Sequence, residues 1–356
     1  MQQLNMDATD YTSPPDDENE PRAAHSDVSE LGQRVKWREP LVRHIFTADP
    51  SAHVFEDRIY VYPSHDIEAG IPQNDEGDHF DMVDYHVLSL KDFDSPVVDH
   101  GPVLHVKDVP WAKKQMWAPD AACRNGTYYL FFPAKDHDDV FRIGVATSQS
   151  PAGPFTARPT PIPGSFSIDP CSFIDDDGTA YLYFGGIWGG QLQRWQTGKY
   201  DPATPYPELD APAVRPRVAR LDADMSGFVG GVQEVSIVDA AGAPLLARDT
   251  DKRFFEGSWM HKHQGTYYFS YSTGDTHFLA YATGKSPLGP FTYRGHILNP
   301  VVGWTTHHSI VEFRGGWYLF YHDSTLSGGV THKRCVKVME LQHEADGSIR
   351  TIDPYR

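Results

Sequence analysis

From Trp37 onward, apolar residues alternate with polar residues in short runs that Gly, Asp and Pro separate. Alternation with a period of two is typical of strands with one buried face, and long helical periodicity is missing from almost the whole chain. Residues 1–36 are instead polar, acidic and proline-containing, and we expect them to form a disordered or loosely attached arm. The pattern therefore predicts one all-β domain over residues 37–356.

Five stretches of this domain share a pattern in which a tight turn leads into a strand with an aromatic residue at an equivalent place. The stretches are residues 47–64, 117–134, 167–186, 254–272 and 306–323. Their equivalent aromatic residues are Tyr60, Tyr129, Tyr181, Tyr268 and Tyr318. Two stretches continue into nearly the same phrase, SPAGPFT at 150–156 and SPLGPFT at 286–292, which we expect to lead into an outer strand.

Repeats of roughly 50 to 85 residues, each with four strands and unable to bury both faces alone, indicate a β-propeller. Five units predict five blades, whereas a β-sandwich would require the five agreeing turns to arise by chance. The first strand of every propeller blade lines the central channel, so we expect the five leading side chains to converge in one cavity. These side chains are Asp49, Asp120, Asp169, Glu256 and His307.

Converging carboxylates suggest chemistry, because like charges held close together raise carboxyl pKa values and destabilise a fold that does not use them. Hydrolysis of a glycosidic bond needs one protonated and one ionised carboxyl group, whose environments push their pKa values apart. Glu256 follows two phenylalanines and precedes Trp259, an apolar setting that favours the acid. Asp49 lies in the polar segment TADPSAH and suits the base, and Asp169 would keep Glu256 protonated and oriented.

The motifs TADPS, SIDP and FFEGSW, in this order and one per blade, resemble glycoside hydrolase family 43 over roughly residues 40–353. This resemblance implies a five-bladed propeller that hydrolyses xylosides and arabinofuranosides with inversion. It makes Asp49 the general base, Asp169 the pKa modulator and Glu256 the general acid. Two motifs depart from the family pattern: EGS replaces the commoner EGP or EAP, and TTHH replaces the usual PGH, which leaves the loop geometry open.

The same resemblance implies a cofactor and a substrate-binding arginine. His307 matches a histidine that holds a calcium ion on the propeller axis, and His308 would take this role if the alignment slips by one residue. Arg334, in the segment HKR, matches an arginine near the substrate and the modulator aspartate. The alternatives are a buried core histidine for His307 and a purely structural ion pair for Arg334.

Sugar rings pack on aromatic faces, so we expect tryptophan in the pocket wall. Trp117 matches a family tryptophan at this place, and Trp188 could cover the pocket from blade three, with packing between blades as the alternative for either. Asp66, with His65, could reach a sugar hydroxyl at the rim, and Asp120 either contacts substrate or fixes blade two by hydrogen bonds. The substrate-binding candidates are therefore Trp117, Arg334, Asp66, Trp188 and Asp120.

The general shape of the family, together with a long insertion at residues 196–250, favours a closed pocket over an open groove, and hence removal of one terminal sugar at a time. The segments DHFDMVDYH and YPSHD resemble the β-xylosidase branch of the family, so xylose is the expected sugar, arabinofuranose is the second choice, and a dual activity fits both. The partner would be a small xylo- or arabino-oligosaccharide. The alternatives are an arabinofuranosidase or arabinanase as main activity, a retaining fructan-cleaving propeller, and a non-catalytic sugar-binding propeller.

Two acidic segments resemble metal sites without fitting one. Residues 77–86, GDHFDMVDYH, have no tetrahedral zinc spacing and lack the EF-hand glycine and distal glutamate. We expect a loop beside the pocket mouth followed by a strand. The acids of IDDDGT belong to a hairpin turn, where Asp-Gly is favoured.

Net charge, cysteine content and the N-terminal sequence limit the expected binding partners and the expected cellular compartment. The net charge of −17 over 356 residues argues against nucleic acid and anionic membrane, because phosphate binding needs a basic face. Three scattered cysteines do not form a disulfide framework, and we expect them to be reduced. The first 30 residues contain neither a basic segment nor an apolar core of a secretory signal, so a cytoplasmic location is expected. The sequence does not fix the oligomeric state.

Overall fold

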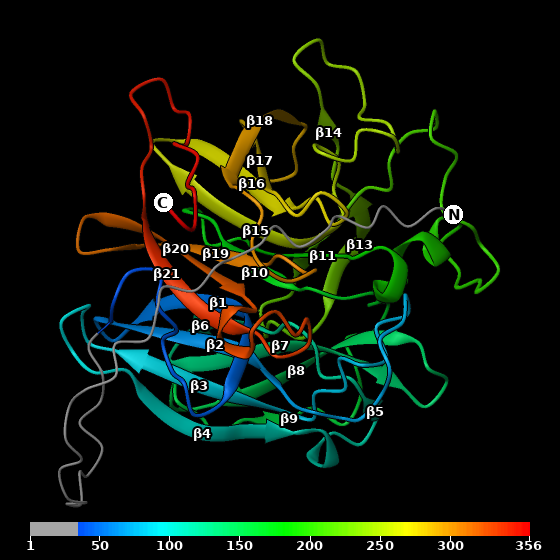
Figure 1. Cartoon of the computed structure of the whole chain (residues 1–356). Coiled ribbons are helices and arrows are strands. Elements are labelled where there is room, and N and C mark those ends of the chain that lie inside the picture. The colour runs from blue at the N-terminus through cyan, green and yellow to red at the C-terminus, as the bar shows by residue number, and fades with distance from the viewer. Residues whose placement is uncertain (1–34) are drawn as a thin grey trace, which may run out of the picture. The chain divides into compact units, whose positions relative to one another are not determined.

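The computed structural model describes residues 35–356 as five β-sheets around a common axis, which confirms the all-β five-bladed propeller. The arm expected at residues 1–36 lies outside the described residues, except for Val35 and Lys36. Figure 1 shows the innermost strands β1, β6, β10, β15 and β19 grouped at the centre. Each of these strands contacts its neighbour on both sides, including β1 with β19, so the ring of blades is closed.

The strands follow the blades in chain order. Blade one contains β1 (Phe46–Phe55), β2 (Arg58–Asp66), β3 (Asp84–Leu90) and β4 (Val98–His105). Blade two contains β5 (Ala112–Lys114), β6 (Asp120–Arg124), β7 (Thr127–Asp136), β8 (Phe141–Ser148) and β9 (Thr156–Ala157). Blade three contains β10 (Cys171–Ile174), β11 (Ala180–Phe184), β12 (Arg217–Leu221) and β13 (Phe228–Glu234).

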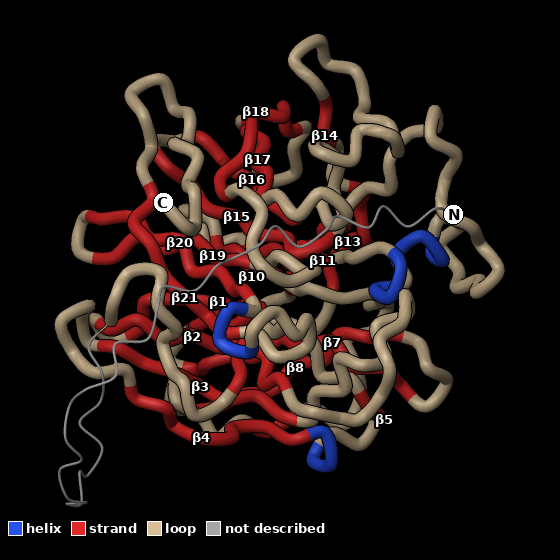
Figure 2. The backbone as a smooth tube through the Cα atoms, in the orientation of Figure 1, coloured by secondary structure: helices blue, strands red, loops and turns tan. Residues whose placement is uncertain are grey.

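Blades four and five complete the ring. Blade four contains β14 (Ile237–Val238), β15 (Glu256–His263), β16 (Thr266–Ser272), β17 (Leu279–Gly284) and β18 (Phe291–Leu298). Blade five contains β19 (His308–Phe313), β20 (Gly316–Asp323) and β21 (Cys335–Leu341). Figure 2 shows how few helical turns accompany the strands. These short 3₁₀ turns are η1 (Val106–Asp108), η2 (Trp188–Gly190), η3 (Leu192–Trp195) and η4 (Thr325–Ser327).

The two similar phrases do lead into outer strands, β9 and β18, as expected. Each phrase also accepts a hydrogen bond from a buried tyrosine of the preceding blade. The hydroxyl of Tyr62 donates to the carbonyl of Pro151 at 2.7 Å, and that of Tyr183 donates to the carbonyl of Pro287 at 2.6 Å. Because a buried hydroxyl needs a partner, the repeated phrase fixes one blade against the next at equivalent places.

Blade five departs from the expected four strands, because it contains three. The segment before β1 runs along its β21 edge instead: the N–H of Leu41 donates to the carbonyl of Val336 at 2.8 Å, and that of Thr47 to Arg334 at 2.9 Å. Leu41 and Val42 are buried in the core shared by blades one and five. The beginning of the domain thus closes the ring against its end, and these contacts cover an edge that would otherwise be unpaired.

The region expected to be an insertion between blades, residues 196–250, contributes β12 and β13 to blade three and β14 to blade four. Most of the blade cores consist of aromatic and aliphatic side chains that face the neighbouring sheets. No helix within residues 35–356 has the length and apolar character needed to cross a bilayer.

Candidate active site

A pocket with about 770 Å³ of empty space, its open mouth included, lies at one end of the channel. All five blades contribute to it, since its lining includes Asp49, Trp117, Asp169, Glu256 and His307. Four of these are the leading side chains expected from the repeat.

Asp49 is buried and held by groups from blades one and five. Its Oδ1 lies 2.9 Å from Nη1 of Arg334, and its Oδ2 accepts a hydrogen bond of 2.8 Å from the hydroxyl of Ser64. Burial alone would raise the pKa of Asp49, but Arg334 and the rings of His307 and His322 outweigh it, so the pKa lies well below its usual range. Asp49 is therefore the ionised carboxylate of the pocket.

Arg334 fills the space between Asp49 and Asp66. Its Nε and Nη2 bind Oδ2 and Oδ1 of Asp66 at 2.8 and 2.7 Å, which is a bidentate pair, while the guanidinium lies over the ring of Phe80. The planar fork of arginine suits this double contact. Arg334 therefore has little freedom to leave Asp49, and it also lines the pocket.

Asp49 and Asp169 share an unusual backbone conformation. Their φ angles are 48° and 56°, in the left-handed region, although a residue before proline normally adopts extended backbone. Such outliers cost free energy and concentrate at functional sites. The Asp-Pro pairs thus bend the chain at two blades so that both carboxylates reach the same pocket.

Asp169 lies against the residue that follows Glu256. Its Oδ2 accepts a hydrogen bond of 2.8 Å from the backbone N–H of Gly257. Burial, assisted by the charge of Asp49, raises the pKa of Asp169 to about 6. Gly257 has a φ of 70°, and an added Cβ would lie 3.3 Å from the ring of His307, so glycine suits this position. Asp169 is therefore tethered to the strand that carries Glu256.

Glu256 is partly open to the pocket and has the opposite character to Asp49. Burial raises its pKa well above the usual range, and the charges of Asp169 and Asp49 raise it further. Phe255 lines the pocket next to it, in the apolar setting that the sequence suggested. The pocket therefore combines a carboxyl group that holds its proton to higher pH than usual with an ionised carboxylate.

His307, and not His308, lines the pocket. Nδ1 of His307 lies 3.6 Å from Oδ1 of Asp49. Burial would lower the pKa of His307, but the charges of Asp169 and Asp49 outweigh it and the pKa is raised. His308 is fully buried and its Nε2 lies 2.7 Å from the hydroxyl of Ser270, which is a core position.

The groups around His307 fit a cation that takes most of its ligands from water. Among residues 35–356, no set of three His, Cys, Asp or Glu side chains converges on His307 closely enough for direct coordination. Oxygens of Asp49 and Asp169 are also engaged by Arg334 and Gly257. The charges of Asp169 and Asp49 nevertheless act on the imidazole, and a divalent ion beside it would meet the same negative charge.

Trp117 forms one wall of the pocket, as expected. Its indole N–H donates to the carbonyl of Phe80 at 2.7 Å, and the ring lies between two glycines. An added Cβ would lie 2.8 Å from the ring at Gly77 and 3.3 Å at Gly189. Glycine at both positions therefore leaves room for the outer edge of the indole.

Three further aromatic rings of the pocket lining form a cluster. Trp188 stacks near Trp304 with centroids 6.0 Å apart, and Phe255 meets both edge-on at 5.6 Å. Trp188 thus faces the pocket as expected, whereas residues 196–250, expected to close it, are not part of its lining. Closure comes instead from the loops at 73–82 and 187–190 and from Trp304.

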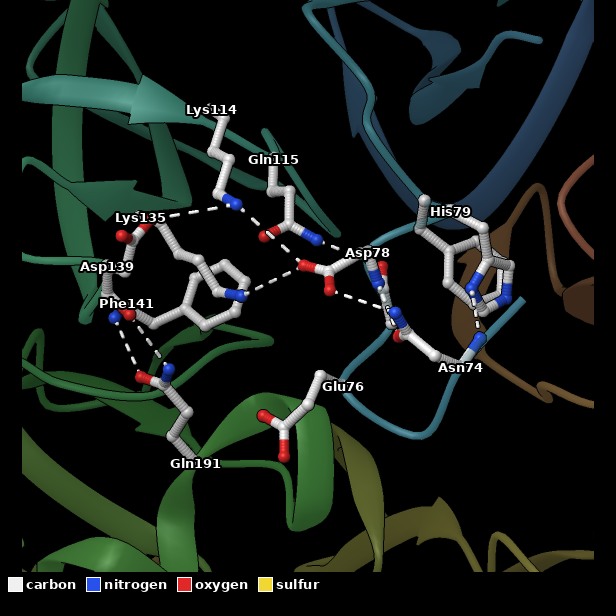
Figure 3. Close-up of polar contacts among 12 residues, drawn as sticks. Asn74, Glu76, Asp78, His79, Lys114, Gln115, Lys135, Asp139, Phe141 and Gln191 are labelled. Atoms are coloured by element: carbon white, nitrogen blue, oxygen red, sulfur yellow. Dashed lines mark hydrogen bonds and ion pairs between the residues drawn. The ribbon is translucent and has the colours of Figure 1, made fainter. Parts of the chain in front are cut away.

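Hydrogen bonds and ion pairs connect the loop at 67–83 to blade two, as Figure 3 shows. Nε2 of Gln115 donates to the carbonyl of Gly77 at 2.9 Å. Oδ1 of Asp78 lies 3.8 Å from Nζ of Lys114 and 3.9 Å from Nζ of Lys135. The segment is thus a loop beside the pocket followed by β3, as expected, and Asp78 pairs with lysines. In IDDDGT, Asp175 likewise pairs with Lys262 at 2.9 Å.

Two substrate-binding candidates lie elsewhere. Asp66 is buried behind Arg334 and is not at the rim. Asp120 lies deeper in the channel, where it binds Ser51 and His53 of blade one and the hydroxyl of Ser172 of blade three at 2.6 Å. Neither side chain lines the pocket. The expected place of Asp66 at the rim is therefore wrong, whereas the hydrogen bonds of Asp120 agree with its second alternative, a structural role.

The register explains the misplacement of Asp120. Tyr60 pairs with His53 and Tyr129 with Ala122, so Asp120 corresponds to Ser51 and not to Asp49. The pocket position of blade two is two residues earlier, at Ala118. Counting residues back from the equivalent tyrosine would have revealed the offset.

Several functional positions carry no strong sequence signal. His322 is buried, and its Nδ1 accepts a hydrogen bond from the N–H of Asp49 at 2.9 Å. Burial lowers the pKa of His322 to about 3, so the ring is neutral. Its only sequence signal is the pair His322–Asp323 at the end of β20, which mirrors His65–Asp66 at the end of β2. Trp304 lacks any comparable signal.

Comparison with known proteins agrees with the geometry. Residues 38–349 match the family model of Glycosyl hydrolases family 43. A xylosidase/arabinosidase from Humicola insolens is 58% identical over 324 residues, which cover 88% of this chain and 99% of that protein. A xylosidase/arabinosidase from Bacteroides ovatus is 56% identical over 314 residues, or 88% of this chain and 97% of that protein.

A solved structure of a β-xylosidase/α-arabinofuranosidase from a compost microbial metagenome, in complex with xylotriose and in a calcium-free form, is also similar. It has a TM-score of 0.90 and 63% identity, and the match covers 92% of this chain and all of that chain. The family match spans the whole propeller, including the three acids and both tryptophan walls. This chain belongs to glycoside hydrolase family 43.

Proposed function

We propose that this protein is an inverting, exo-acting glycoside hydrolase that releases terminal xylose from β-1,4-linked xylo-oligosaccharides, and arabinofuranose as a second product. The observation that carries the proposal is the opposite shift of two carboxyl pKa values in one pocket, downward for Asp49 and upward for Glu256. An acid and a base are thus available together near neutral pH. The similarity to xylosidase/arabinosidases supports the sugar.

In this mechanism Glu256 donates its proton to the glycosidic oxygen as the bond from that oxygen to the anomeric carbon breaks. Asp49 removes a proton from a water molecule on the opposite face of the sugar, and the water oxygen bonds to the anomeric carbon. Such an in-line arrangement requires carboxyl groups about 6.5–9.5 Å apart and inverts the configuration. Asp169 acts on Glu256, because its charge raises the pKa of the acid.

The aromatic walls favour a terminal sugar. The flat C–H faces of a xylose ring suit the indole of Trp117, and a second ring beyond the cleaved bond suits the cluster of Trp188, Trp304 and Phe255. A related enzyme binds xylotriose. A β-xylopyranoside and an α-L-arabinofuranoside can present similar hydroxyls to one pocket, which favours dual activity.

Calcium is part of the proposal as an ion beside His307. Its ligands from the chain would be the imidazole and, through water, the surrounding carboxylates Asp49 and Asp169. The ion would supply positive charge that tunes the ionisation of the acids. The similarity to an enzyme described as a calcium-free form supports this assignment.

The test is hydrolysis of nitrophenyl β-xyloside, nitrophenyl α-L-arabinofuranoside and xylotriose by wild type and Glu256→Ala. We expect xylose from the non-reducing end of xylotriose, and ¹H NMR of the first product should show α-xylose from a β-linkage. β-Xylose as the first product would indicate retention and contradict the assigned base. Equal rates of hydrolysis by wild type and Glu256→Ala would contradict the assigned acid. No release of sugar by the wild type would leave a sugar-binding propeller as the better description.

A further inference from the structure

Blade one carries a cluster of histidine and aspartate side chains, none of which lines the pocket. One ligand atom each of His65, Asp84 and His86 lies within 4.8 Å of the others. His65 lies on β2 and the other two on β3. Because Ser64 pairs with Tyr85, His65 stands opposite Asp84, and all three side chains share one face of the sheet. Among residues 35–356, no other three such side chains converge as closely.

Carboxylates orient both imidazoles of this cluster. Nδ1 of His65 lies 2.6 Å from Oδ1 of Asp84, and Nδ1 of His86 lies 3.0 Å from Oδ1 of Asp99. The two rings are neighbours, with centroids 4.6 Å apart. Asp99 is not one of the three ligands, so its carboxylate fixes the tautomer of His86 and leaves the other ring nitrogen free to bind a metal. The contact between His65 and Asp84 joins two of the ligands, and an ion would replace the proton that they share.

The donor types select the class of metal. Two imidazoles and one carboxylate suit Zn²⁺ and other first-row divalent ions, whereas Ca²⁺ and Mg²⁺ take most of their ligands from oxygen, as water would supply beside His307. The side chains of His65, Asp84 and His86 are 18%, 13% and 8% exposed. The cluster is thus shielded by the sheet yet open on one side, where water would complete a tetrahedral shell. We propose that His65, Asp84 and His86 bind a divalent transition-metal ion, with Zn²⁺ as the best fit.

The position of the cluster suggests what this ion would do. His65 nearly ends β2 and Asp84 begins β3, so the two residues flank the loop at 67–83. This loop supplies Asn74, Gly77 and Phe80 to the pocket lining. An ion that joins both ends of the loop would restrict its motion. It would therefore act on substrate binding and on loop order, and it would supply no chemistry to the acids.

The test compares Zn²⁺ binding by calorimetry among metal-free preparations of wild type and three variants. His65→Asn/His86→Asn removes both imidazoles, His137→Asn removes an exposed histidine of the β7–β8 turn, and His307→Ala removes the pocket histidine. We expect the double variant alone to lose one equivalent of tightly bound Zn²⁺. The same number of equivalents in the double variant and in wild type would overturn the proposal and leave ordinary His–Asp pairs.

Two further measurements do not require the double variant to fold. In the His307→Ala background, the electron paramagnetic resonance spectrum of one equivalent of Cu²⁺ should show coupling to two imidazole nitrogens, and its absence would contradict the site. Amide hydrogen exchange over residues 67–83 of the wild-type protein should slow at least several-fold when one equivalent of Zn²⁺ is added. Unchanged exchange would overturn the role in loop order. Neither readout depends on glycosidase activity, so failure of the proposed function would be seen separately.

Discussion

Nη1 of Arg334 lies 2.9 Å from Oδ1 of Asp49, while the remaining nitrogens of the same guanidinium hold Asp66 in a bidentate pair. All three groups are buried, so the ion pairs are weakly screened by water. The pairing keeps Asp49 ionised at a distance from the bulk solvent, where an unpaired carboxylate would take up a proton. One cation from blade five therefore determines which carboxylate of blade one can act as a base.

We expect Arg334→Met to move the acid limb of the pH–rate profile to higher pH. The base must be ionised, and activity is lost as the pH falls through its pKa. Without Arg334 the pKa of Asp49 rises, by about 1–3 units for loss of an adjacent opposite charge, so activity is lost at a higher pH. The profile of kcat/KM against pH for nitrophenyl xyloside measures the shift.

The same substitution leaves Asp49 and Asp66 buried without their cation, which should lower the free energy of unfolding by about 3–5 kcal/mol. Urea denaturation at pH 7 measures this loss. Arg314→Met, which changes a half-exposed arginine paired with Asp57 and Asp92, is the matched control for both experiments. An acid limb at the same pH in Arg334→Met and in wild type would contradict the role assigned to the pair.

We expect Glu256→Gln to lower kcat on xylobiose by about 10²–10⁴, the usual contribution of a general acid. The amide is nearly the same size but cannot donate a proton to the glycosidic oxygen. The loss should be much smaller for nitrophenyl xyloside, because a nitrophenolate leaves without protonation. Glu312→Gln, at an exposed position of β19, is the control. An equal loss on both substrates would argue that Glu256 acts in some other step.

We expect Asp169→Asn to move the basic limb of the profile to lower pH. The ionised Asp169 raises the pKa of Glu256, and the acid is active only while protonated. Removing the charge lowers the pKa of Glu256, so activity is lost earlier as the pH rises. Asp138→Asn, in an exposed turn, should leave the limb in place. A loss of rate with no change in the basic limb would assign Asp169 to substrate binding instead.

The sequence predicts much of this architecture because its signals are local. Each blade begins with a turn and an aromatic strand, and five repetitions identify the propeller. The Asp-Pro pairs at Asp49 and Asp169 lie at bends that bring both carboxylates to the pocket. The two phenylalanines before Glu256 indicate the apolar environment of its carboxyl group. Where one short segment contains both the functional residue and the neighbours that determine its environment, the prediction agrees with the geometry.

The remaining features depend on register and on partners distant in the chain. Asp120 was misplaced by two residues because a bulge in β1 separates Asp49 from the regular pairing that Asp120 follows. Asp66 lies behind Arg334 and not at the rim, and the sequence alone does not show this because Arg334 is 268 positions away. The cluster on blade one was hidden because residues 77–86 contain only two of its members, and His65 joins them across the sheet.

We expect a calcium chelator to slow turnover and to lower the melting temperature, since an ion beside His307 would offset the repulsion among the pocket carboxylates. Added Ca²⁺ should restore both quantities, whereas Zn²⁺ should not. The addition of each metal by itself is needed because a chelator also removes any ion bound to blade one. His307→Ala should be indifferent to Ca²⁺. If chelation changes neither rate nor melting temperature in wild type, the calcium assignment fails.

A variant of Asp120 distinguishes a structural role of this side chain from a role in substrate binding. Its two oxygens join blades one and three through Ser51, His53 and Ser172, and the side chain is 1% exposed. In Asp120→Asn an amide N–H₂ replaces one acceptor, so at least one buried donor loses its partner at a cost of about 1–3 kcal/mol. We expect a lower free energy of unfolding in urea but an unchanged KM at 20 °C.

The pH dependence of this loss has a definite sign. Burial would raise the pKa of Asp120, but His53 and the hydroxyl donors outweigh it, and the folded-state pKa is lowered. The stabilisation is therefore complete above the unfolded pKa of about 3.9 and disappears as the pH falls through the folded value. The difference between wild type and Asp120→Asn should shrink in acid. An increased KM with unchanged stability would return Asp120 to the substrate and contradict its place in the channel.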